Sequence, residues 1–91
     1  MPLLDVRFEE RPTGDSVLEV LSPVRRSALS NVRLVLFELG IQIVRVESLV
    51  RETGLVERFF VQELDSTRVS RRRAARIRGA VRRLLRAVRA A

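Results

Sequence analysis

The last third of the chain carries the pattern that most constrains the fold. From Ser70 to about Val88 the sequence predicts a helix, with Ser70 as its N-terminal cap. At 100° per residue, one arc of this helix is apolar and the arginines lie on the other side, apart from Arg73 near the start. The apolar arc consists of Ala74, Ile77, Val81, Leu84, Leu85 and Val88. Such a face needs an apolar partner, and we expect the helix to cover one face of a sheet.

Two segments before position 22 predict strands of that sheet. Within residues 3–10, Leu4, Val6 and Phe8 alternate with polar neighbours, which is typical of a short strand. Residues 17–21 predict a second strand. Strong turn signals at residues 11–15 lie between the two, so we expect them to form a hairpin.

The middle of the chain adds one helix and two strands. Residues 27–39 predict a helix that Gly40 ends in a left-handed cap. Residues 41–50 are rich in β-branched side chains, and residues 55–64 predict a strand that returns after the turn at 52–54. The order strand, strand, helix, strand, strand, helix predicts an α+β sandwich in which both helices lie on one face of a four-stranded antiparallel sheet. The whole chain, residues 1–91, is expected to be a single domain.

Two apolar side chains of the first predicted helix depart from its pattern. Leu34 and Phe37 point away from the apolar side, toward expected solvent. One interpretation is a contact surface for a partner protein. The other is that a dimer, or a repositioned Leu4 or neighbouring loop, covers them. In the last strand we expect Phe59 and Val61 in the core, and Phe60 on the face that no helix covers.

The composition argues against catalysis. The chain has no His, Cys, Lys, Tyr or Trp, so the usual general acids and bases at neutral pH, thiol nucleophiles and soft metal ligands are absent. The remaining acids show no convergent spacing. We interpret Glu47, Glu52, Glu57 and Glu63 as offsetting arginines rather than coordinating a cation. The sequence therefore predicts a protein that is not an enzyme and needs no cofactor.

The charge is unevenly distributed along the chain. Residues 68–91 hold ten arginines and no acid, whereas residues 1–67 hold eight arginines and eleven acids, which leaves a net charge of +7. Such a tail can bind phosphates, and an arginine-rich nucleic-acid-binding module is the alternative function. The chain has only four aromatic residues and no visible nucleic-acid-binding motif, so a solvated arginine face is the favoured interpretation.

No segment suggests a membrane or exported protein. No apolar run approaches the roughly 18 residues that span a bilayer. Residues 1–5 show no export signal, and the absence of cysteine is compatible with the cytoplasm. We therefore expect a cytoplasmic protein without a membrane partner.

Three stretches together resemble an ACT domain. They are Val17-Leu18-Glu19-Val20-Leu21, then Phe37-Glu38-Leu39-Gly40-Ile41-Gln42-Ile43, and Arg58-Phe59-Phe60-Val61-Gln62-Glu63-Leu64-Asp65. The final helix adds the segment Ala75-Arg76-Ile77-Arg78. The chain is most similar to the C-terminal ACT domain of bacterial PII uridylyltransferases, over roughly residues 6–88.

This resemblance implies a ferredoxin-like sandwich that pairs and senses small ligands. In that fold an edge strand normally follows the second helix, but this chain ends after the helix. The N-terminal strand around Val6 is expected to replace it by pairing with residues 17–21. The family's ligand loop carries Asp and Gly where this chain has Val24 and Ser27. Both differences argue against amino-acid binding. At the second position Gly lets the ligand approach the backbone closely, and the side chain of Ser27 crowds that approach.

A weaker anion site is predicted beside the first helix. Arg25 and Arg26 precede its N-terminus, where backbone N–H groups and the helix dipole favour a carboxylate or phosphate. Ser27 and Asn31 would assist them, and Gln42 of the ACT-like segment completes the predicted ligand set. The alternative is a pair of solvated arginines in a loop.

These observations predict a non-catalytic regulatory or interaction module. We expect a homodimer that forms through a sheet edge or the uncovered sheet face and binds a partner protein, or less readily a small anionic or amino-acid-like ligand. The remaining hypothesis is a regulatory segment that belongs to a longer enzyme.

Overall fold

The computed structural model describes residues 5–12, 14–23 and 26–90, the side chains of the last two excepted. The elements follow the predicted order of strands and helices. They are β1 (Asp5–Glu10), β2 (Ser16–Ser22), α1 (Leu29–Glu38), β3 (Ile41–Arg51), β4 (Gly54–Glu63) and α2 (Arg71–Ala90).

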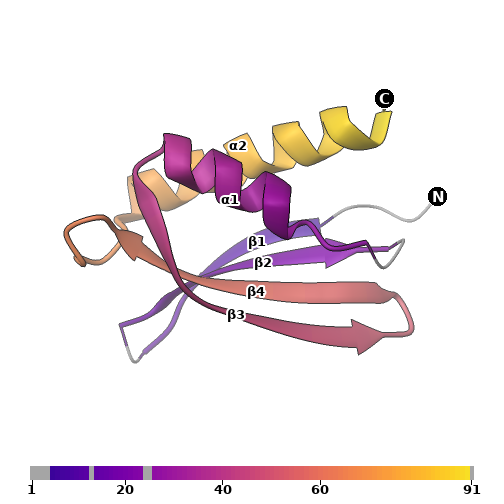
Figure 1. Cartoon of the computed structure of the whole chain (residues 1–91). Coiled ribbons are helices and arrows are strands. Elements are labelled where there is room, and N and C mark those ends of the chain that lie inside the picture. Colours follow the sequence, from indigo (N-terminus) through magenta and orange to yellow (C-terminus); the bar gives the residue numbers. More distant parts are fainter. Residues whose placement is uncertain (1–4, 13, 24–25, 91) are drawn as a thin grey trace.

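The four strands form one antiparallel sheet in the order β1-β2-β4-β3. Both helices lie on the same side of this sheet, with α1 in front of α2 in Figure 1. Val6 pairs with Val20, which confirms the hairpin predicted for the first two strands. The arrangement is an α+β sandwich compatible with a ferredoxin-like fold. Its two edge strands are β1 and β3.

The hydrophobic core lies between the helices and the sheet. Phe59, Leu18 and Leu36 are its largest fully buried side chains. The apolar arc of α2 covers the β1 side of the sheet, and α1 lies over β3. The prediction that Phe59 and Val61 belong to the core is confirmed. Burial of this apolar surface is the main stabilising term, at roughly 25 cal/mol per Å² removed from water.

Several predicted boundaries need correction. Helix α1 begins at Leu29 rather than Ser27, because the Ser27 hydroxyl and the Ala28 N–H donate hydrogen bonds to the Glu57 carboxylate on β4. Strand β4 begins one residue earlier than predicted, at Gly54, and ends at Glu63. The predicted contribution of Leu4 lies outside the described residues.

Both helix caps predicted from the sequence are present. Gly40 has a φ of +72°, as a left-handed cap requires, and its N–H donates to the Phe37 carbonyl. The Ser70 hydroxyl accepts a hydrogen bond from the Arg73 N–H at 3.2 Å, which is the N-cap arrangement.

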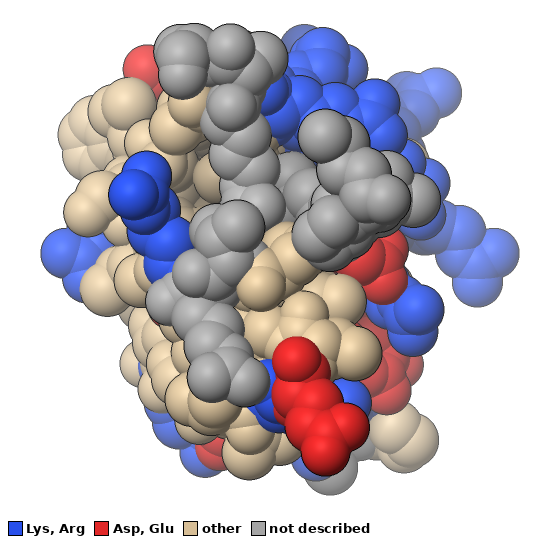
Figure 2. Space-filling view, turned by 90° about the vertical axis from the view of Figure 1, so that its right-hand side faces the viewer, with Lys and Arg blue, Asp and Glu red and all other residues tan. Residues whose placement is uncertain are grey.

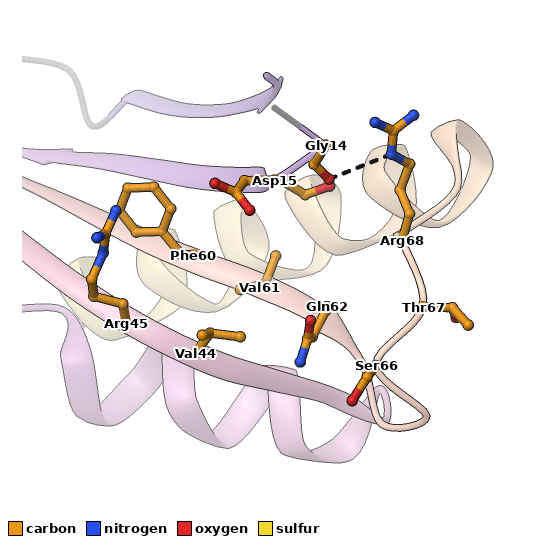
Figure 3. A pocket seen from close by; sticks show the side chains of 11 residues that line it. Gly14, Asp15, Val44, Arg45, Phe60, Val61, Gln62, Ser66, Thr67 and Arg68 are labelled. Carbon is orange, nitrogen blue, oxygen red and sulfur yellow. Dashed lines mark hydrogen bonds between the residues drawn. The ribbon is translucent and has the colours of Figure 1, made fainter. Parts of the chain in front are cut away.

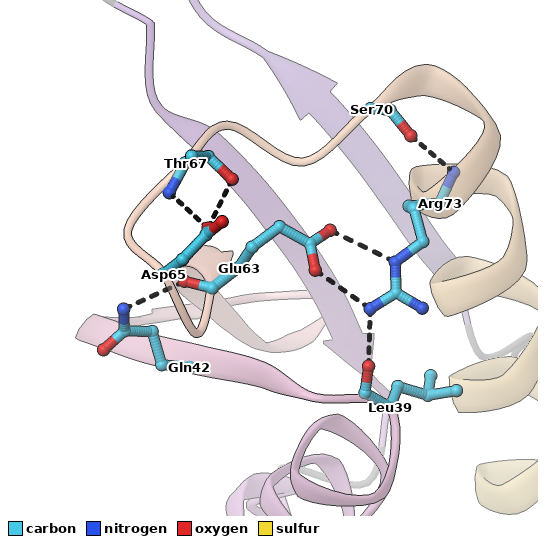
Figure 4. Close-up of polar contacts among 7 residues, drawn as sticks. All are labelled: Leu39, Gln42, Glu63, Asp65, Thr67, Ser70 and Arg73. Atoms are coloured by element: carbon cyan, nitrogen blue, oxygen red, sulfur yellow. Dashed lines mark hydrogen bonds and ion pairs between the residues drawn. The ribbon is translucent and has the colours of Figure 1, made fainter.

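The arginine that interrupts the apolar arc of α2 has a structural role. Figure 4 shows the Arg73 guanidinium pointing between two elements. Its Nε and Nη2 atoms donate to the two carboxylate oxygens of Glu63 at 3.1 and 3.0 Å, and Nη2 also donates to the Leu39 carbonyl. The hydrogen bond to Glu63 raises the pKa of Arg73 above its ordinary range, although burial opposes this shift. One side chain thus joins α2, β4 and the end of α1.

The face of the sheet without helices is covered by charged side chains. Phe60 projects onto this face, as predicted, yet it is only 5% exposed. The Arg45 and Arg11 guanidinium carbons lie 4.1 and 5.6 Å from the centroid of its ring, so cation–π contacts shield it. Beside it, Arg58 pairs with Glu19 across β4 and β2 at 2.9 Å. The aromatic side chain of this face is therefore covered by charged groups rather than open to solvent.

Candidate functional site

Exposed apolar side chains gather along one side of the molecule. Phe37 is 81% exposed and Leu34 54%, which confirms that neither belongs to the core. Four more large apolar side chains lie along the neighbouring edge strand β3 or at the end of β4. These are Val44, Leu49, Val50 and Leu64. Of the seven such side chains among the described residues, only Val88 lies elsewhere. Phe37, Val44 and Leu64 line one groove, and exposed apolar side chains that share a groove favour an interaction surface.

A groove runs between the outer side of α1 and the β3 edge. It has a volume of about 550 Å³ and is lined by Arg33 and Phe37 from α1, by residues 41–46 of β3, and by Leu64. Its walls are mostly apolar. Phe37 stands at the rim of this groove, which continues onto the unpaired edge of the sheet.

The edge strand itself is long and irregular at one point. β3 has 11 residues, and within the part of the chain that the structure describes it pairs with β4 alone, so its other side is an open edge of the sheet. A bulge between Ile43 and Arg45 places Val44 out of register. The bulge brings Val46 opposite Phe59 on the helix side and Arg45 opposite Phe60 on the other. Val44 is consequently 62% exposed.

A second hollow, of about 370 Å³, lies at one end of the face without helices (Figure 3). Arg45, Phe60 and Gln62 line it from the strands, and Asp15 and Arg68 line it from the connecting segments. Its cationic groups are already engaged. The Arg68 side chain pairs with Glu10 at 3.1 Å and donates to the Gly14 carbonyl, while Arg45 pairs with Glu47 at 3.5 Å and lies over Phe60.

The predicted anion site at the start of α1 already holds a carboxylate of the chain itself. Glu57 is 3% exposed, and its two oxygens accept hydrogen bonds from the Ser27 hydroxyl at 2.8 Å and the Ala28 N–H at 2.7 Å. A further anion would meet this negative charge at the helix terminus. The geometry therefore gives the predicted ligand site no support at Ser27.

The other predicted ligand residues do not converge. Arg26 is exposed in the loop before α1, and Asn31 lies half-buried in its first turn. Gln42 lies near the start of β3, six residues from Ser48, which is the partner of Glu57. At about 3.3 Å per residue, Gln42 lies roughly 20 Å along the strand from that position. Its amide donates instead to the Glu63 carbonyl at 3.0 Å (Figure 4). Arg25 lies outside the described residues.

The sequence pattern predicted no role for Glu57 at the start of α1 or for Val44 on the β3 edge. From the sequence, Glu57 is interpreted as offsetting arginines and is not assigned to the helix side of the sheet. The alternation of β4 gave a usable signal, because Glu57 shares a face with Phe59 and Val61. Val44 could not have been found in this way. A strict alternation does not reveal a bulge, and without the bulge the outward residues of β3 are misassigned.

The described residues contain neither a metal-binding cluster nor a membrane-spanning helix. Among residues 5–12, 14–23 and 26–90, no group of three or more acids, histidines or cysteines could hold a metal ion. Within the same ranges, neither helix combines the length and the apolar character that crossing a membrane requires.

Comparisons with known proteins do not identify a family. No family model matches the chain, and neither a curated protein nor a solved structure matches it.

Proposed function

We propose that the protein is a non-catalytic interaction module that pairs with a second copy of itself along the β3 edge. The observation that carries this proposal is the 81% exposure of Phe37 beside an apolar groove that opens onto an unpaired strand. Burying these side chains and satisfying the edge backbone groups would stabilise a pair, at roughly 25 cal/mol per Å² of apolar surface.

The charges on β3 favour a second copy as the occupant. Arg45 and Glu47 flank Val46 and project on the same side of the sheet. If two β3 strands pair antiparallel with Val46 opposite its own counterpart, Arg45 of each chain faces Glu47 of the other. The edge is thus self-complementary about one residue, which is what a two-fold interface requires. Cross-strand pairs of opposite charge contribute roughly 0.2–1 kcal/mol each.

The same pairing would also bury the exposed residues of α1. A two-fold axis perpendicular to the sheet keeps both helix layers on one side of a continuous sheet. Because α1 lies over β3, the two α1 helices would flank the junction. Leu34 and Phe37 would then contact the second copy.

The ACT-like character of the chain is part of this proposal. β1 pairs beside β2 at the sheet edge, where an ACT domain has its last strand, which supports the interpretation that β1 replaces that strand. In this interpretation the paired module is a cytoplasmic regulatory unit whose surface can also receive a partner protein. The carboxylate of Glu57 at the start of α1 makes ligand sensing a lesser role.

Serine substitutions on α1 test the apolar part of the interface. We expect Leu34→Ser with Phe37→Ser to leave the folded structure intact and to weaken self-association at least tenfold, about 1.4 kcal/mol or more. Sedimentation equilibrium over a hundredfold concentration range measures this. Val88→Ser removes an exposed apolar side chain from α2 and should have no effect. Equal association of all three proteins would contradict the proposal, and so would a monomeric wild type.

Charge reversals test the register of the pair. Arg45→Glu places two acids opposite two acids, and Glu47→Arg places two arginines opposite two arginines, so each variant alone should associate poorly. An equimolar mixture restores both opposite-charge pairs and should form a heterodimer. Mixed species detected by native mass spectrometry would support the register. If both single variants associate as the wild type does, this strand pairing is wrong.

A further inference from the structure

The exposed side of α2 carries a concentration of positive charge that the rest of the chain does not neutralise. Six arginines of this helix are exposed, and none of their side chains has a hydrogen bond or ion pair to another described residue. They are Arg71, Arg72, Arg76, Arg78, Arg83 and Arg86. In Figure 2, blue side chains crowd the upper right of the molecule, the side on which α2 lies.

Five arginines of the described residues do contact an acid within 4 Å, and only Arg73 among them belongs to α2. The other four are Arg7, Arg45, Arg58 and Arg68. All eleven acids lie between Asp5 and Asp65, so α2 contains none. Like charges four residues apart on a helix, such as Arg72 and Arg76, destabilise it by a few tenths of a kcal/mol. An external anion would relieve this repulsion.

We propose that the exposed face of α2 binds the phosphodiester backbone of a nucleic-acid duplex without reading its sequence. Three of the arginines form a row, because Arg72, Arg76 and Arg83 lie within about 40° of one another at 100° per residue. Along the axis this row extends about 16 Å at roughly 1.5 Å per residue. A duplex carries about ten phosphate charges over that length, at one per about 1.7 Å.

The composition of this face selects phosphate backbone over the other anionic partners. Between the arginines it presents only small residues, including Ala75 and Gly79, so a strand can approach closely. A protein interface needs apolar or aromatic anchors, and the exposed arc has none. Insertion into a membrane needs the apolar arc of the helix, but Ile77, Val81 and Leu85 are at most 3% exposed in the core. Backbone phosphate contacts need neither kind of group.

The site is independent of the proposed pairing. α2 lies over β1 at the opposite edge of the sheet from β3. Pairing along β3 therefore leaves both copies of this face open. Either proposal can fail while the other holds.

Matched triple variants test the site. The variant Arg72→Gln, Arg76→Gln and Arg83→Gln removes the row, while Arg7→Gln, Arg11→Gln and Arg58→Gln removes three positive charges from the face of the sheet without helices. Both lower the net charge by the same amount. The probes are labelled 20-base-pair duplexes of DNA and of RNA, each in two unrelated sequences, titrated by fluorescence anisotropy between 50 and 300 mM salt.

We expect wild type and the sheet-face variant to bind all duplexes alike, with a strong salt dependence. The α2 variant should bind on the order of a hundredfold more weakly near 0.1 M salt, and its plot of log K against log salt should be shallower by about 0.9 for each phosphate that it no longer neutralises. Equal weakening by both variants would show a net-charge effect and overturn the proposal. So would tighter binding to polyglutamate or to vesicles with anionic lipid than to the duplexes.

Discussion

The Ser27 hydroxyl lies 2.8 Å from a carboxylate oxygen of Glu57, although the two residues are 30 positions apart in the chain. The second oxygen of the same carboxylate accepts the Ala28 N–H at 2.7 Å. An acid in the middle of β4 thus accepts the N–H of the N-cap residue Ala28, as the Glu or Gln of a capping box does from within its own helix. Its negative charge also complements the positive end of the α1 dipole. The contact fixes where α1 begins relative to the sheet.

Replacing Glu57 should therefore destabilise the whole domain. Glu57→Gln keeps the size of the side chain but removes its charge, so the buried hydrogen bond from the Ala28 N–H is no longer charge-assisted. Hydrogen bonds to charged groups contribute roughly 1.5–3 kcal/mol and neutral ones about 0.5–1.5 kcal/mol, so we expect a loss on the order of 1 kcal/mol. For a domain of this size we expect the melting temperature to fall by about 4–8 °C for each kcal/mol. Urea unfolding measures the free energy.

Glu47→Gln is the matched control. The Glu47 side chain is on the same sheet but is exposed, and its contact with Arg45 is long at 3.5 Å. We expect its effect to remain within about 0.5 kcal/mol. Equal stabilities of the two variants would show that the cap contributes nothing measurable.

Arg73 should stabilise the fold out of proportion to its neighbours. Its paired bonds to Glu63 are partly buried and tie α2 to β4. Arg73→Met keeps the aliphatic stem and removes the charge-assisted bonds, and we expect the free energy of unfolding to fall by about 1–2 kcal/mol. Arg72→Met, one position earlier and exposed, should be nearly neutral. Thermal melts of both variants measure these effects. If Arg73→Met leaves the stability unchanged, the Arg73–Glu63 pair contributes no more than the hydration of the two separate charges.

Much of the fold could be predicted because its signals are local. The apolar arc of α2, the Gly40 cap and the alternation in β1 and β2 each depend on residues close in sequence. The long-range contacts could not be predicted. Nothing near Glu57 indicates that its carboxylate reaches Ala28, and nothing near Phe60 indicates that Arg11 and Arg45 cover its ring. The hydrogen bonds from Ser27 and Ala28 to Glu57 could not be foreseen for that reason, whereas the exposure of Phe37 followed from helical spacing alone.

Asp65 should make the stability of the domain depend on acid pH. The Thr67 hydroxyl, and then its N–H, donate to this carboxylate and lower the pKa of Asp65 below its ordinary value. A carboxyl with a lowered folded pKa stabilises the protein above its unfolded pKa, about 3.9. That contribution declines as the pH falls through the folded pKa, so stability should decrease below about pH 4.

A threonine substitution isolates this contact. Thr67→Val removes the hydroxyl, so the pKa of Asp65 should rise toward its ordinary value in an NMR titration of carboxyl carbons. Thr53→Val, in the turn between β3 and β4, should leave that pKa unchanged. If the pKa of Asp65 stays lowered in Thr67→Val, the Thr67 hydroxyl does not cause the shift and the backbone N–H accounts for it.

Two glycines should respond to alanine in opposite directions. Gly54 begins β4 with a φ of +141°, and a Cβ there would lie 2.3 Å from the Ser22 carbonyl oxygen and 2.7 Å from the Pro23 Cα. Both are backbone atoms that cannot move aside without shifting β2, so Gly54→Ala should cost at least about 2 kcal/mol. At Gly79 in the middle of α2, a Cβ would meet only the end of the Arg83 side chain at 3.5 Å. Gly79→Ala should therefore stabilise the helix by about 0.5–1 kcal/mol. Urea unfolding of the two variants checks both signs, and a destabilised Gly79→Ala would mean that α2 is more closely packed at this position than its exposed arc indicates.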